Sequence, residues 1–108
     1  MAKLEKNITG DFDGLLEKIE KGILSGSDTA SLEDSSDFVS GDARCSVRVF
    51  ERFSYTGGNR LSLSVTLFQN AGGPIHVSAI SAGGSNAVLF KMNRWGEEAF
   101  LNKLKELI

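Results

Sequence analysis

The stretch "ARCSVRVFERFSYTGGNRLSLSVTLF", residues 43–68, decides the fold, because apolar side chains alternate with other residues on both sides of a glycine turn. A period of two is typical of β-strands that bury one face. The turn "YTGGN" at 55–59 predicts that the two strands form a hairpin. The odd-numbered apolar residues predict the core face, and they are Cys45, Val47, Val49, Phe53, Leu61, Leu63, Val65 and Leu67.

The same alternation continues after the turn at 70–73. Residues 75–80 place Ile75, Val77 and Ala79 on the core face and the even-numbered residues on the other face. Residues 3–9 predict a further short strand, with Leu4 and Ile8 on one side. Residues 29–39 indicate only a weak strand, with "EDSSD" as a turn or bulge, and the apolar run at 87–92 is too short to assign.

Two segments have the period of a helix instead. From residue 11 onward, apolar residues recur every three or four positions, which predicts an amphipathic helix capped by Thr9 or Asp11. This stripe comprises Phe12, Leu15, Leu16, Ile19 and Ile23. The terminal segment "WGEEAFLNKLKELI", residues 95–108, predicts a second amphipathic helix with Phe100, Leu101, Leu104, Leu107 and Ile108 on one side.

The predicted order is therefore strand, helix, four strands, helix, or β-α-β(4)-α. We predict an α+β fold in which both helices pack on one face of an antiparallel sheet, because each helix and each strand must bury one apolar side. A chain of 108 residues fits a single domain, which we assign to residues 1–108. The order resembles the TATA-binding-protein-like fold and is similar to a minimal helix-grip fold of the Bet v 1 kind.

Composition excludes several classes of partner. With 12 basic and 14 acidic side chains, the chain lacks the positive field that attracts nucleic acid or anionic membranes. No segment approaches the ~20 apolar residues of a spanning helix or has the pattern of a signal peptide, so we expect no membrane partner. Cys45 is the single cysteine, which excludes an internal disulfide and predicts cytoplasmic residence.

Three longer segments resemble a family of small, uncharacterised bacterial proteins, mostly from Firmicutes, grouped as a domain of unknown function. They are "GDFDGLLEKIEKGIL" at 10–24, "SGDARCSVRVFERFSYTGGNRLSLSVTLFQN" at 40–70 and "GEEAFLNKLKELI" at 96–108. The resemblance covers nearly the whole chain and implies a bacterial, cytoplasmic, single-domain protein. Its motifs are turns and core positions, so it implies no catalytic or binding residue.

No residue pattern predicts catalysis. His76 is the single histidine, and no carboxylate is placed to orient it, so we interpret it as a half-exposed strand residue on the outer face. Cys45 is interpreted as a core residue on the opposite face from His76, which argues against a shared metal. We therefore expect no metal and no cofactor. The alternative is an enzyme or small-ligand carrier, its ligand unknown, with a cleft between the sheet and the C-terminal helix and with His76 and Ser85 near the mouth.

The even-numbered residues predict an outer sheet face that mixes arginines with apolar side chains. The candidate binding residues on it are Arg44, Arg48, Phe50, Arg52, Phe68, His76 and Ile80. Three interpretations stay open: a solvated face, stacking against a second copy, and a platform for nucleic acid or an acidic ligand. Because the chain is acidic overall, we favour a face left to water or to a second copy over a nucleic-acid platform. We therefore expect a non-catalytic binding or protein-interaction module, for which a homodimer through this face is one of the two favoured interpretations.

Overall fold

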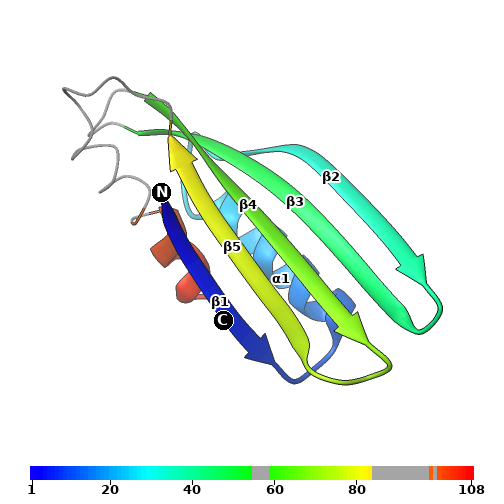
Figure 1. Cartoon of the computed structure of the whole chain (residues 1–108). Helices are drawn as coiled ribbons and strands as arrows, with labels where there is room; N and C mark the ends of the chain where they lie inside the picture. Colours follow the sequence, from blue (N-terminus) through cyan, green and yellow to red (C-terminus); the bar gives the residue numbers. More distant parts are fainter. Residues whose placement is uncertain (55–58, 84–97, 99) are drawn as a thin grey trace.

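The computed structural model describes residues 1–54, 59–83, 98 and 100–108 (Figure 1). Residues 98 and 100–105 are helical and are called the C-terminal helix below. The other elements, in chain order, are β1 (Ala2–Ile8), α1 (Phe12–Ser25), β2 (Ser31–Ser40), β3 (Ala43–Ser54), β4 (Asn59–Asn70) and β5 (Ile75–Gly83).

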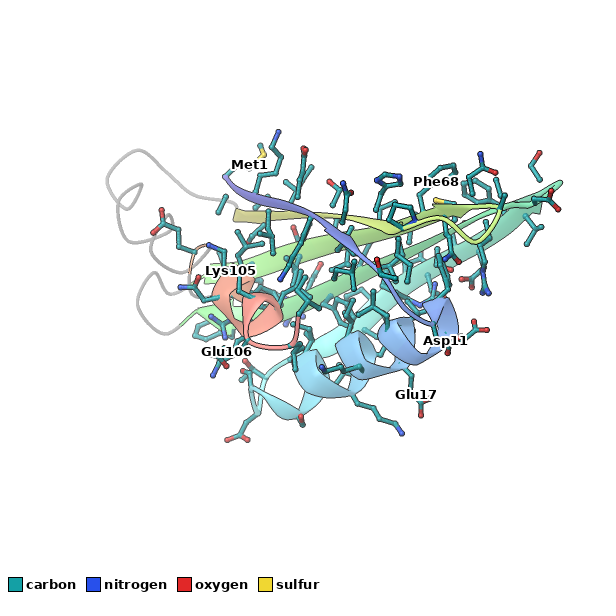
Figure 2. All side chains as sticks on the ribbon, turned by 90° about the horizontal axis from the view of Figure 1, so that it is seen from below. Met1, Asp11, Glu17, Phe68, Lys105 and Glu106 are labelled. Atoms are coloured by element: carbon teal, nitrogen blue, oxygen red, sulfur yellow. The ribbon has the colours of Figure 1, made fainter. Side chains whose placement is uncertain are left out.

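The five strands form one sheet in the order β1-β5-β4-β3-β2, and every neighbouring pair is antiparallel. Both helices lie on the same side of this sheet, and no described element covers the other side (Figure 2). The α+β prediction, with two helices packed on one face of an antiparallel sheet, is therefore confirmed.

The predicted helix from residue 11 onward is confirmed in its bounds, its cap and its buried stripe. The Asp11 carboxylate, and not Thr9, caps α1 by accepting a hydrogen bond from the amide of Gly14 at 2.8 Å. Four of the five predicted stripe residues are buried and Leu15 is partly buried. A Cβ added at Gly22 would overlap the side chain of Leu107, so the glycine allows the end of the chain to pack closely on α1.

The core consists of one apolar cluster between the sheet and the two helices. The C-terminal helix contributes Phe100, Leu101 and Leu104 to it, as its periodicity predicts. On β4 and β5 the odd-numbered residues are buried, as predicted, and they are Leu61, Leu63, Val65, Leu67, Ile75, Val77 and Ala79.

On β3 the predicted parity is wrong. Phe50 is fully buried and Arg48 is only 8% exposed, so the even-numbered residues face the helices. The cause is the register of the β3–β4 hairpin, in which Arg48 pairs with Val65 and Phe50 with Leu63. Paired residues share a face of the sheet, so an even position on β3 lies beside an odd position on β4. A connection with an even number of residues produces this reversal, whereas the same parity on both strands would need an odd number.

Four predicted outer-face residues are therefore corrected to the helix side, namely Arg44, Arg48, Phe50 and Arg52. The three arginines are accommodated there because each guanidinium finds a partner. Arg44 lies over the ring of Phe12 at 4.0 Å, and Arg52 over that of Phe100 at 4.6 Å. Their long stems cover apolar surface where the core ends.

Arg44 and Arg48 also form ion pairs with α1. Arg44 binds Asp13 at 2.8 Å, and Arg48 binds Glu20. Asp13 and Glu20 are seven residues apart on a helix, a rise of about 10 Å, while the two arginines are four residues apart on a strand, about 13 Å. These matched spacings are the signal in the sequence that indicates which way the arginines point.

The weakly indicated segment at 29–39 is a ten-residue edge strand, β2. The predicted bulge is present, because the pairing with β3 shifts register between Leu32 and Asp34. The shift sends Leu32 to the helix side beside Phe50 and Asp34 to the other side beside Val49. The run at 87–92 lies outside the described residues.

Candidate functional site: the outer sheet face

The outer sheet face is the side of the sheet that neither helix covers (Figure 2). Pairing across the strands defines its members, since paired residues share a face. Its described residues are Lys3, Glu5 and Asn7 on β1, Ser31, Asp34, Ser36, Phe38 and Ser40 on β2, Ala43, Cys45, Val47, Val49, Glu51 and Phe53 on β3, Arg60, Ser62, Ser64, Thr66, Phe68 and Asn70 on β4, and His76, Ser78, Ile80 and Ala82 on β5.

One line of paired residues crosses all five strands of this face, and we call it the transverse row. From β2 to β1 it runs Phe38, Cys45, Phe68, His76 and Asn7. At the spacing of neighbouring strands the row is about 19 Å long. Its apolar members are accessible, with Phe38 exposed by 57% and Phe68 by 40%. Figure 2 shows the Phe68 side chain projecting away from both helices.

His76 occupies the outer face, as predicted. Its Nδ1 lies 2.7 Å from Oδ1 of Asn7, and because an amide oxygen only accepts, Nδ1 donates this hydrogen bond. The ring stacks on Phe68 with centroids 6.2 Å apart. None of the contacts of His76 within the described residues is to a carboxylate. The arrangement orients the ring but does not activate it as a base.

Cys45 is corrected from a core residue to a half-buried residue of the outer face, on the same side as His76. β4 separates the two strands that carry them, with Phe68 between their side chains. Two strand spacings, about 10 Å, are too far for a shared metal ion. Burial, with a smaller effect from the charge of Asp37, raises the pKa of the Cys45 thiol, so the thiol is protonated at neutral pH and is a poor nucleophile.

Charges on the outer face lie at its margins and are mostly paired. Lys3 binds Glu5 at 3.3 Å, and Arg60 binds Glu51 at 2.9 Å. The prediction of a nucleic-acid platform depends on Arg44, Arg48 and Arg52, and these three residues lie on the helix side. The outer face therefore presents apolar and hydroxyl side chains without a positive field.

The predicted cleft between the sheet and the C-terminal helix corresponds to a hollow of about 340 Å³ at the start of β1. Its lining residues are Met1, Ala2, Lys3, Glu98, Leu101, Asn102 and Lys105. His76 is on the other face of the sheet, and Ser85 lies outside the described residues. Of the two residues predicted near its mouth, His76 is therefore not among the described residues that line the hollow.

A family model matches residues 1–108, and its description is a family of unknown function, DUF6054. The chain belongs to the DUF6054 family. No curated protein and no solved structure matches the chain. The family confirms the predicted relationship to a domain of unknown function and leaves the chemistry of the outer face open. Among the described residues, no helix is both long enough and apolar enough to cross a membrane.

Proposed function

We propose that this DUF6054 protein is a non-catalytic interaction module that binds a second copy of itself through the outer sheet face. The observation that carries the proposal is the transverse row, which places three accessible rings, those of Phe38, Phe68 and His76, on a sheet face that neither helix covers. Stacking against another sheet, at a separation of about 10 Å, would bury the exposed apolar side chains of such a face.

The size of the face agrees with a stable dimer. Five strands spaced by about 4.8 Å and about ten residues long cover roughly 24 by 33 Å, or about 800 Å². This equals the contribution of one partner to an interface of standard size. The interface would bury Phe68 and Ile80, each of which is 40% exposed in the single chain.

The charge pattern also favours self-association. Lys3 and Arg60 are already paired with carboxylates of the same face, and Asp34 lies at its β2 margin, so among the described residues no unpaired charge lies in the middle of the face. A twofold axis through the middle of the face would place the transverse rows across each other, and the marginal charges would form the polar rim of the interface.

The proposal includes the origin and the location implied by the family resemblance, a bacterial protein of the cytoplasm. The half-buried, unpaired Cys45 supports a reducing compartment. The element order and the sheet order support the likeness to TATA-binding-protein-like and helix-grip folds.

The oligomeric state of Ile80→Glu tests the proposal. Ile80 is on the outer face and 40% exposed, and Leu24 on α1 is a matched control with 38% exposure on the other side of the molecule. Sedimentation velocity between 1 and 500 μM, concentrations chosen to span ordinary dimer affinities, is expected to show a monomer–dimer equilibrium for the wild type and for Leu24→Glu. Ile80→Glu is expected to weaken it at least tenfold. A wild-type chain that stays monomeric throughout, or equal effects of both variants, would overturn the proposal.

A further inference from the structure

β2 presents a free edge of the sheet. It pairs with β3 on one side, and within the described chain no strand pairs with its other side. The strand is ten residues long, and nine of these are exposed. Proteins usually shorten or cover such edges, because unpaired backbone amides and carbonyls readily accept another strand. A long accessible edge is therefore a candidate surface for strand addition.

The edge is acidic and has no basic residue between 31 and 40. Asp37 is neutralised within the fold, since it binds Arg48 at 3.0 Å and accepts a hydrogen bond from Ser46. Within the described residues, Glu33 at the bulge accepts a hydrogen bond from the Ser31 hydroxyl, and Asp34 accepts one from the Ser35 amide. No described residue supplies a cation to either of them, so two carboxylates at the bulge keep their charge uncompensated.

A shallow hollow of about 150 Å³ adjoins the bulge on the outer sheet face. Val47 and Val49 of β3 give it apolar walls, and Asp34 contributes a carboxylate. A lysine or arginine side chain has the matching form, with an apolar stem and a cationic end. The edge thus offers backbone pairing and a site for one long basic side chain.

A second copy of β2 does not fit this edge well, because two acidic strands would bring like charges together. We propose that the β2 edge binds an extended basic segment of a partner protein as a sixth strand. One lysine or arginine of that segment lies over Val47 and Val49 and pairs with Asp34. The hollow lies at the β2 margin of the outer sheet face, whereas Phe68 and Ile80 of the proposed dimer contact lie on β4 and β5.

The test is titration of the ¹⁵N-labelled full chain with the synthetic peptide TKVRVKVT, followed through backbone amide chemical shifts. Shift changes are expected to concentrate in residues 31–40, and the acidic counterpart TEVEVEVT is expected to cause none. Asp34→Asn keeps the hydrogen bond to the Ser35 amide but loses the charge, and it is expected to weaken binding at least fivefold. Asp42→Asn is the matched control, because Asp42 is an exposed carboxylate outside the strand, and it is expected to change binding less than twofold.

The inference is overturned if the basic peptide shifts no amide of 31–40, if the acidic peptide binds equally well, or if Asp34→Asn and Asp42→Asn weaken binding to the same extent. The titration is repeated on Ile80→Glu. Retained binding by that variant shows that the edge acts independently of the dimer contact, and loss of binding there contradicts the separation of the two sites.

Discussion

Replacing Phe50 and Phe68 by alanine, one at a time, tests the orientation of β3 on which both proposals depend. Phe50 is fully buried on the helix side, whereas Phe68 is 40% exposed on the outer face. A buried phenylalanine removes about 150–200 Å² from water, or about 4–5 kcal/mol at 25 cal/mol per Å². Truncations of this kind cost about 3–5 kcal/mol, so we expect a loss in that range for Phe50→Ala.

Phe68→Ala is expected to cost only about 1 kcal/mol in the monomer, because the ring loses only its contacts with its neighbours on the sheet, the His76 ring among them. Urea unfolding followed by circular dichroism at 2 μM measures both values. With a slope near 1.5 kcal/mol per M, the two midpoints should differ by about 2 M. Equal losses for the two variants in the monomer, or a larger loss for Phe68→Ala, would refute the orientation of β3. At high protein concentration the cost of Phe68→Ala should rise if the outer face dimerises.

Three further outcomes follow from contacts of α1 and β3. Gly22→Ala should destabilise the chain by about 1–3 kcal/mol in urea unfolding, despite the better helix propensity of alanine, because the new methyl group overlaps Leu107. Adding Leu107→Ala to this variant should remove most of the overlap. A Gly22→Ala variant that is more stable than the wild type would contradict this packing. Arg48→Met should lower the free energy of unfolding by about 1–3 kcal/mol, because the Arg48 side chain is only 10% exposed. Arg44→Met should lower it by less than about 1 kcal/mol, because the Arg44 side chain is 36% exposed. A larger loss for Arg44→Met than for Arg48→Met would contradict this ranking. The hydroxyl of Ser46 and the Arg48 guanidinium lower the pKa of Asp37 below 3.8. A lowered pKa gives stability that is present above 3.8 and is lost as the pH falls below it, so the fall in unfolding free energy in acid should be smaller in Arg48→Met; identical acid titrations of the two proteins would exclude this linkage.

The parts of the fold that the sequence predicts correctly are those in which one face is uniformly apolar. On β4 and β5 the core positions are aliphatic except for Ser81, and on α1 the stripe is complete, so burial alone fixes their orientation. On β3 both faces carry apolar residues, since Val47 and Val49 oppose Phe50. Periodicity cannot choose between two such faces, and the choice depends on the length of the hairpin connection and on the carboxylates of α1.

The candidate site was predicted in part for the same reason. The prediction that Phe68, His76 and Ile80 lie on the outer face is correct, because the predicted orientation of β4 and β5 is correct. Phe38 was not identified, because β2 contains few apolar residues and an irregular register, and its pairing with Cys45 depends on the bulge. Exposed edge strands are difficult to recognise from hydrophobic pattern alone, since they need no buried face along most of their length.

The ion pairs between α1 and β3 have a consequence for the uniqueness of the native state. A helix with an apolar stripe can shift along an apolar sheet face with little change in buried area. Hydrophobic burial alone therefore defines the axial position of the helix poorly. Asp13 and Glu20 both meet their arginines only at one position, and a displacement of a single turn, about 5.4 Å, would separate both pairs. The two salt bridges therefore fix the axial position of α1, because they favour one placement of the helix among several that bury a similar apolar area.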